Sequence, residues 1–220
     1  MSLEDPPGMR PLASVSLTHV QYDDSDPLGM FMAYASLAPI AIIISYVTLI
    51  FFRRDLATIL MFVGQLVNEG VNFVAKKIVR QARPTEYLGK GYGMPSSHSQ
   101  FVAYFAFYIT IYAFTRFTFQ SRAWKPLITI AAMSMAGLVA YSRIHLTYHT
   151  PPQVLVGLTC GALFAGLWFA FCNWVLAPAI DLDSSVARWL LLRDTRDVPN
   201  VLVFEYETYR QYHAQKEKTS

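Results

Sequence analysis

The sequence predicts an all-α integral membrane protein, a multi-span helical bundle. Of its 220 residues, 54% are hydrophobic and only 15% are charged, and the mean hydropathy is +0.30. A soluble domain of this length carries about a quarter charged residues. The apolar residues also gather into long windows, and about 20 mostly apolar residues in a row suffice to cross a bilayer.

Five windows are long enough to span, at residues 28–52, 56–79, 99–119, 124–141 and 154–176. The segment before them is polar and acidic and has no apolar core, so no cleavable signal peptide is expected. The chain then divides into an N-terminal segment at 1–27, a transmembrane domain at 28–178 and a polar tail at 179–220. The net charge of +3 is too small and too dispersed to indicate a nucleic-acid partner.

Five spans put the two termini on opposite sides of the membrane. The connections on the C-terminal side carry cations almost without acids, at Arg53, Arg54, Arg116, Arg122 and Lys125. The N-terminal segment is acidic instead. The positive-inside rule therefore makes the C-terminal side cytosolic and the other side lumenal or extracellular. This assignment sets aside the cations at 76–83, which have a chemical explanation of their own.

Within the tail, residues 184–193 place a Trp and Leu cluster between two arginines. This composition suits a short helix lying at the membrane interface. An ordinary cytosolic helix packed against loops fits equally well.

The second window ends in cations, with Lys76, Arg80 and Arg83 spaced four and three residues apart before Pro84. On a helix this spacing puts the three side chains on one face, and Pro84 would end the helix. Long cationic side chains are common anchors at span ends. A row of cations also binds phosphate well, because each guanidinium offers a planar fork of donors.

The stretch GMPSSHSQF at 93–101 begins an apolar helix with hydroxyl groups and an imidazole. Ser96 or Ser97 fits an N-cap, and the free N–H groups of a helix N-terminus attract anions. Capping accounts for one serine only. The second serine and His98 therefore favour an anion site over simple capping beside an interfacial histidine.

The segment SRIHLTYHTPPQ at 142–153 contains Arg143 and His149 and joins the last two windows. Its last four residues fit a capping box, which would make Gln153 structural. Gln153 also follows His149 by four residues, so its amide should reach the ring, and the sequence leaves both roles open. His145 has no partner in the local pattern and is expected at the interface.

All three polar segments fall on the same side of the membrane when there are five spans. Two histidines, several cations and a helix N-terminus suit phosphate-ester cleavage, since one histidine can attack phosphorus while the other protonates the leaving oxygen. Asp and Glu are absent from these segments apart from Glu86. We therefore expect no metal and no other cofactor.

The spacing resembles the signature of the type 2 phosphatidic acid phosphatase superfamily, the membrane relatives of the vanadium haloperoxidases: K-x6-R-P, P-S-G-H and S-R-x5-H-x3-D. Residues 76–84 match the first part in full. In the second, Ser97 replaces glycine, and in the third, Gln153 stands where the superfamily has Asp. The resemblance implies a helical bundle of that type, with residues 28–178 as a phosphatase domain.

Further stretches resemble the dolichyldiphosphatases, including LTHVQY at 17–22, NEGVN at 68–72 and LLRDTRDVPNVLVFEY at 191–206. This resemblance implies metal-independent hydrolysis of dolichyl diphosphate to dolichyl phosphate and phosphate. It also implies an active site on the lumenal face of the endoplasmic reticulum membrane, recycling the carrier lipid for N-glycosylation. The implied partners are a polyprenyl diphosphate and the bilayer, and no protein partner is indicated.

By position, the resemblance makes His149 a nucleophile that forms a phosphohistidine, and His98 the general acid and then the base. Gln153 would orient His149, as an Asp does in other triads. The groups that would hold the transferred phosphoryl group are Lys76, Arg83, Ser96, Ser97 and Arg143. The helical phase of Arg80 suggests a contact with the second phosphate of a diphosphate.

Two other functions stay open: a broader lipid phosphatase acting on phosphatidic acid or other prenyl diphosphates, and an inactive lipid-binding scaffold, for which the missing Asp is the argument. Glu69 is a separate question. An ionisable side chain within a span is a functional candidate. Together with Asn68 and Asn72 it also fits interhelical hydrogen bonding, which we favour, or a brace behind Lys76.

Overall fold

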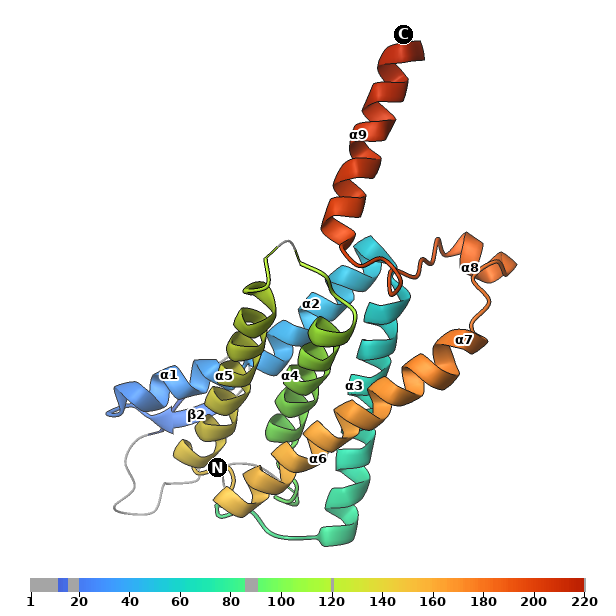
Figure 1. Ribbon diagram of the computed structural model, residues 1–220. Helices are drawn as coiled ribbons and strands as arrows, with labels where there is room; N and C mark the ends of the chain where they lie inside the picture. Colours follow the sequence, from blue (N-terminus) through green and yellow to red (C-terminus); the bar gives the residue numbers. More distant parts are fainter. Residues whose placement is uncertain (1–11, 16–19, 86–90, 120, 220) are drawn as a thin grey trace.

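The computed structural model describes residues 12–15, 20–85, 91–119 and 121–219. It is a helical bundle with a small hairpin beside it and one helix standing away from it (Figure 1). The hairpin pairs β1 (Leu12–Val15) with β2 (Val20–Asp23) in antiparallel register. The bundle helices are α1 (Pro27–Ala35), α2 (Ala38–Arg53), α3 (Leu56–Val79), α4 (Ser97–Thr115), α5 (Trp124–His145) and α6 (Pro151–Phe171). The chain continues through a π-helical turn (Cys172–Leu176), α7 (Ala177–Ala179), α8 (Ser185–Trp189) and α9 (Val201–Thr219).

The bundle carries the apolar lengths that a membrane requires. Four stretches of the described residues are long and apolar enough to cross it: Pro27–Arg53, Leu56–Val79, Trp124–His145 and Pro151–Ala179. α4 is 19 residues long and runs in the same layer between them (Figure 1). Its polar first turn, SHSQ, lowers its mean hydropathy. The chain is therefore a multi-pass membrane protein.

The first predicted window is not one continuous helix. α1 ends at Ala35 and α2 begins at Ala38, with a break at Ser36 and Leu37, although the whole stretch Pro27–Arg53 keeps the length and apolarity of the span expected at 28–52. Ser36 is buried and its hydroxyl donates to the carbonyl of Ala33 at 2.7 Å. Pro39 lies in the first turn of α2, where a missing N–H costs nothing.

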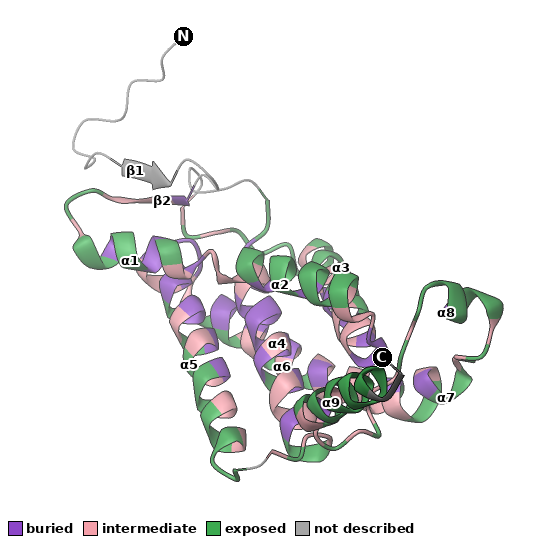
Figure 2. Cartoon of the chain, turned by 90° about the horizontal axis from the view of Figure 1, so that it is seen from above, coloured by how far each residue is buried: buried purple, intermediate pink, exposed green. Residues whose placement is uncertain are grey.

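α4 lies at the centre of the bundle and packs chiefly against α6, then α5 and α3. Figure 2 shows buried residues concentrated on α4 and on the helices around it. The contact with α6 is close because two glycines face the backbone of α4. A Cβ on Gly157 would lie 2.6 Å from the carbonyl oxygen of Ser96, and one on Gly161 would lie 2.2 Å from that of Gln100. Small residues commonly allow such approach between membrane helices.

Side-chain amides join α3 to α4 within the apolar layer. Gln100 Nε2 donates to Asn68 Oδ1 at 2.9 Å, and Asn72 Nδ2 donates to Gln100 Oε1 at 2.8 Å. Gln65 Nε2 donates to the carbonyl of Phe101 at 3.3 Å. The interpretation of Asn68 and Asn72 as interhelical hydrogen-bonding residues is confirmed. Glu69 takes no part in this network.

The tail docks onto the turn between α2 and α3. Asp55, the N-cap of α3, accepts hydrogen bonds from the backbone and hydroxyl of Thr195 at 3.0 and 2.7 Å. Arg53 forms an ion pair with Glu205 at 2.7 Å. α8 falls in the predicted segment and leaves Trp189 81% exposed, as an interfacial helix would. The sequence patterns did not predict α9, which projects away from the bundle (Figure 1).

The contact between α4 and α6 predicts a stability difference between two glycines of α6. Gly161→Ala should lower the free energy of unfolding by about 1–3 kcal/mol, because an added methyl meets backbone and the helices must separate. Gly166→Ala is the matched control, since no described atom lies within 4 Å of its added Cβ. Thermal unfolding in detergent measures both. Equal melting temperatures for the two variants would contradict this account of the packing.

Candidate active site

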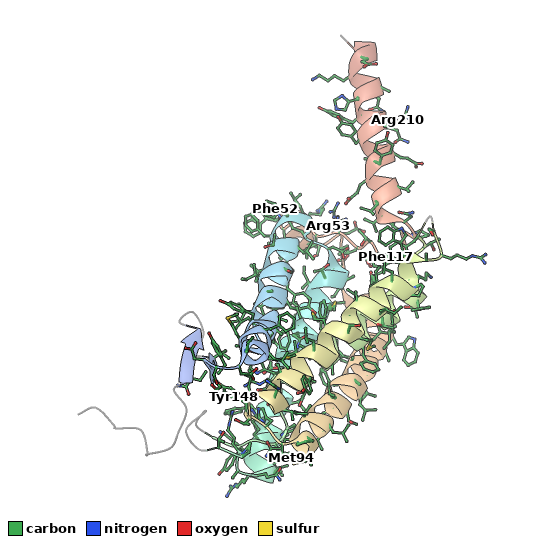
Figure 3. The ribbon with its side chains drawn as sticks, turned by 90° about the vertical axis from the view of Figure 1, so that its left-hand side faces the viewer. Phe52, Arg53, Met94, Phe117, Tyr148 and Arg210 are labelled. Carbon is green, nitrogen blue, oxygen red and sulfur yellow. The ribbon has the colours of Figure 1, made fainter. Side chains whose placement is uncertain are left out.

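The three polar segments meet at one end of the bundle. In Figure 3, Tyr148 and Met94 lie at that end, whereas Arg53 and Phe117 lie at the opposite end. A cavity of about 530 Å³ opens between the segments. Its polar lining consists of Ser36, Glu69, Arg83, Ser97, His98, Arg143, Tyr148 and His149. The expectation that distant segments come together at one membrane face is met.

His149 is held in a defined orientation. Its backbone N–H donates to the carbonyl of Arg143 at 3.0 Å, and its ring Nδ1 lies 3.2 Å from Gln153 Oε1. The backbone N–H of Thr150 also reaches Gln153 Oε1, at 3.3 Å, while Gln153 Nε2 donates to the carbonyl of Ala82 at 2.8 Å. These two bonds fix which end of the amide is the oxygen. Nδ1 must therefore carry the proton, and Nε2 keeps its lone pair.

Gln153 thus makes the contacts of both roles that the sequence left open. It closes the capping box of α6 by accepting a hydrogen bond from the backbone N–H of Thr150. It also accepts a hydrogen bond from the Nδ1–H of His149. It is almost fully buried, and its amide also ties the start of α6 to the loop after α3 through Ala82. One side chain therefore connects the cap, the ring and a neighbouring loop.

His149 is neutral at physiological pH. Burial lowers the pKa of its imidazole to about 3, and the charges of Arg143 and Arg83 act in the same direction. A neutral ring has a nitrogen lone pair, which is what attack on phosphorus requires. The neighbouring cations therefore favour the reactive form of the nucleophile before substrate arrives.

Two arginines supply positive charge, and neither forms an ion pair with a described carboxylate. Arg143 is only 4% exposed, and its guanidinium stacks on Tyr148 at 4.0 Å from the ring centroid. The Nε atoms of both Arg83 and Arg143 are buried and have no hydrogen-bond partner among the described residues. Burial also lowers the pKa of Arg83, although an arginine stays charged in proteins. Buried guanidinium groups with free donors indicate a place for an anion.

Lys76 lies beside the site and is hydrogen-bonded to Ser97, which lines the cavity, although Lys76 itself is not part of the described lining. Lys76 Nζ donates to Ser97 Oγ at 3.3 Å across the gap between α3 and α4. Ser97 and His98 both line the cavity from the first turn of α4. Helix N-termini favour anions, so this turn adds to the attraction from the cations.

Arg80 departs from its predicted position. α3 ends at Val79, well before Pro84, and Arg80 takes a left-handed conformation with φ of 53°. The expectation that Lys76, Arg80 and Arg83 share one helical face is therefore wrong. The Nε of Arg80 donates to the carbonyl of Lys77 at 2.9 Å, and the described cavity wall does not include Arg80.

Ser96 is built into the contact between α4 and α6. It is the N-cap of α4 by backbone position, but within the described residues its side chain makes no cap hydrogen bond. Its hydroxyl accepts from Ser99 at 3.0 Å, and its backbone N–H donates to the carbonyl of Gln153 at 3.1 Å. The predicted phosphate contact of the Ser96 hydroxyl has no support in this geometry, because the side chain is fully buried and bonded elsewhere.

His145 has a partner that the local sequence could not reveal. Its Nε2 lies 2.7 Å from Asp26 Oδ2. Asp26 is the N-cap of α1 and accepts from the backbone of Leu28 at 3.0 Å. His145 therefore connects the end of α5 to the start of α1, and its expected place at the membrane interface stays a prediction.

The sequence analysis missed two parts of the site. Tyr148 supports Arg143, and its own hydroxyl accepts from the backbone N–H of Gln21 at 2.9 Å. The apolar wall of the cavity comes from the hairpin, the break before α2 and α4: Val20, Leu37, Pro39, Ile40, Ile43 and Phe101. A Ser and a Pro inside an apolar run, at 36 and 39, were the available signal for that break.

Metal chemistry has no obvious ligand set in this part of the molecule. Across residues 12–15, 20–85, 91–119 and 121–219, no group of three or more His, Cys, Asp or Glu side chains could hold a metal ion. Metal-independent hydrolysis stays a prediction, which chelation tests below.

Comparison with known proteins agrees with this geometry. The sequence model of the PAP2 superfamily matches residues 56–176. The chain is 41% identical over 208 residues to dolichyldiphosphatase 1 of Rhinolophus ferrumequinum, covering 89% of this chain and 87% of that one. It is 37% identical over 208 residues to lipid phosphate phosphatase gamma of Arabidopsis thaliana, covering 90% and 92% respectively.

Among solved structures, the fold is similar to that of a transmembrane PAP2-type phosphatidylglycerolphosphate phosphatase from Bacillus subtilis. The TM-score is 0.59 at 23% identity, over 69% of this chain and 80% of that one. At this identity the likeness concerns the fold alone. The superfamily match covers the helices that carry all three polar segments, and the relatives extend over most of the chain. The chain belongs to the PAP2 superfamily.

Proposed function

We propose that this protein hydrolyses dolichyl diphosphate to dolichyl phosphate and inorganic phosphate through a phosphohistidine on His149. One observation carries the proposal: a neutral histidine, fixed by Gln153, lines a cavity with two arginines that have no counter-ion among the described residues. The similarity to dolichyldiphosphatases over most of the chain supports the choice of lipid.

In the first step, Nε2 of His149 attacks the terminal phosphorus, and an N–P bond replaces the P–O bond to the lipid phosphate. The bonding electron pair leaves with the lipid phosphate oxygen, which takes a proton from His98, protonated in the complex with the anionic substrate. Gln153 Oε1 accepts a hydrogen bond from the Nδ1–H of His149 as the ring becomes positive. The carbonyl dipole stabilises that charge, though less than a carboxylate would.

In the second step, water attacks the phosphohistidine and His98 accepts its proton. The N–P bond breaks, phosphate leaves, and both histidines return to their starting forms. Arg83, Arg143 and Lys76 hold the phosphoryl oxygens throughout. Positioning and charge stabilisation of this kind provide most of the catalysis in phosphoryl transfer.

A long prenyl chain fits the shape of the cavity. Its apolar wall includes Ile40 and Ile43, which are 43% and 38% exposed. The head group can therefore reach the cations while the chain stays in lipid. The resemblance to dolichyldiphosphatases implies the endoplasmic reticulum membrane. The excess of cations in the connections opposite the site supports a lumenal site and a cytosolic C-terminus.

A broader lipid phosphatase is the second candidate, and the similarity to a plant lipid phosphate phosphatase favours it. The site chemistry is common to both functions. The inactive-scaffold alternative loses its main argument, because Gln153 makes the ring contact expected of the missing Asp.

Substrate and mechanism can be tested together. Purified protein in detergent and EDTA should release phosphate from dolichyl diphosphate faster than from phosphatidic acid. His149→Ala should lower the rate of phosphate release at least about a thousandfold, because no other group replaces the nucleophile. His213→Ala, on α9, is the matched histidine control and should keep full activity. Equal rates on both lipids would favour the broader function, and dependence on added metal would contradict the mechanism.

Gln153 predicts a separation between catalysis and helix capping. Gln153→Ala should lower kcat by about ten- to a hundredfold with little change in KM, because the ring loses its acceptor. The kcat of Gln153→Asp should stay within about tenfold of the wild-type value, since a carboxylate accepts the same hydrogen bond from Nδ1–H and adds negative charge.

Thr150→Ala is the control for capping alone. It should cost about 1 kcal/mol of stability while leaving kcat near the wild-type value. A loss of kcat in Thr150→Ala as large as that in Gln153→Ala would instead assign Gln153 a purely structural role.

A further inference from the structure

Glu69 is the cavity residue that the proposed mechanism does not use. It lies on α3 between Asn68 and Asn72, which both bond to Gln100 of α4. Glu69 points away from that contact and lines the cavity instead. Its Oε1 is buried and has no hydrogen-bond partner among the described residues. A buried carboxyl oxygen without a partner costs free energy unless a ligand satisfies it.

The brace role for Glu69 has no direct ion pair to support it among the described residues. Lys76 Nζ donates to Ser97 Oγ at 3.3 Å, and no ion pair within 4.0 Å joins Lys76 to Glu69 in the described chain. Glu69 precedes Lys76 by seven residues on the same helix. At the usual helical rise, this places Glu69 about 10 Å deeper in the bundle than Lys76.

The cavity lining has a polar end, with His149, Arg83 and Arg143, and we call the part lined by Glu69 the inner limb. Ile40 and Ile43 line the same cavity and are partly exposed. A lipid whose terminal phosphorus meets His149 extends its chain along this limb and passes Glu69.

We infer that the Glu69 carboxyl contacts the lipid-side phosphate of a bound diphosphate and selects such lipids over lipid monophosphates. The inference rests on the proposed function, in which the terminal phosphate lies at His149. The second phosphate is then one bridging oxygen further along the inner limb. In a lipid monophosphate the same place is taken by the organic part of the ester, which offers Glu69 no phosphate oxygen.

The contact requires one proton between the two groups. A carboxylate and a phosphate without a counter-ion repel each other strongly where water is scarce. When they share a proton, a carboxyl O–H donates to a phosphate oxygen, which is a strong, charge-assisted hydrogen bond. This bond shortens as the lipid phosphate gains negative charge while it leaves, so it favours the transition state over the bound substrate.

Glu69→Gln and Glu69→Leu test the contact, with Val67→Ala on the opposite side of α3 as control. A glutamine amide still donates a hydrogen bond, whereas leucine cannot. With dolichyl diphosphate, Glu69→Leu should lower kcat/KM by about ten- to a hundredfold, mainly in kcat, and Glu69→Gln should stay within a few-fold of wild type. The inhibition constant of inorganic phosphate should not change in either variant, because that anion fills only the pocket beside His149.

The outcomes separate this inference from the proposed function. If wild-type protein shows no His149-dependent release of phosphate from the diphosphate, the proposed function fails and the inference fails with it. If the wild-type protein is active but Glu69→Gln lowers kcat/KM for the diphosphate as much as Glu69→Leu does, the donor role of Glu69 is overturned. The same holds if inorganic phosphate inhibition weakens in parallel with turnover, since that would indicate a general disturbance of the site.

Discussion

The structure depends on buried positive charge at one end of an apolar bundle. Arg143 is buried and Arg83 is half-buried, and neither Nε has a partner among the residues described. Such charges are costly unless they are compensated. The stacking of Arg143 on Tyr148 and the anchoring of Tyr148 to the hairpin offset part of that cost. A phosphate ligand would offset the rest, which links affinity for substrate to the stability of the site.

The packing around α4 serves this arrangement of charge. Gly157 and Gly161 let α6 approach α4 closely, which brings the start of α6, with Gln153, beside Ser96. On the other side, the amides of α3 and α4 hold Lys76 near Ser97. Interhelical hydrogen bonds and close packing replace the hydrophobic effect as the forces that hold helices together in lipid. The same contacts that stabilise the bundle thus position the groups of the site.

Gln153 shows how a substitution for Asp can keep the geometry of a triad while giving up its charge. The amide oxygen still selects the tautomer of His149, but it stabilises the imidazolium less than a carboxylate would. A diphosphate substrate tolerates this loss, because a lipid phosphate is a better leaving group than an alkoxide. The neutral amide of Gln153 also avoids placing a negative carboxylate close to the negatively charged phosphate oxygens.

Sequence spacing was sufficient to predict which segments meet, because helical spans fix the side of the membrane on which each motif emerges. His98, His149, Arg83 and Arg143 all lie where that argument places them. Local spacing failed where tertiary contacts decide the backbone. The end of α3 at Val79 has no Gly or Pro to mark it, since Arg80 itself takes the left-handed conformation. The partner of His145 lies 119 residues away, beyond any local pattern.

The opposite end of the bundle shows that this chain can pair its cations. There Arg53 and Arg193 share Glu205, at 2.7 and 3.2 Å, and Arg196 pairs with Asp194. At the cavity, by contrast, Glu69 is the one carboxylate of the described lining, and it forms no ion pair with a described cation. Three arginines at that end thus have a carboxylate partner, whereas Arg83 and Arg143, beside the two histidines, form no ion pair with a described carboxylate. That asymmetry is the reason to regard the cavity as a site for a phosphate rather than as an imperfection in packing.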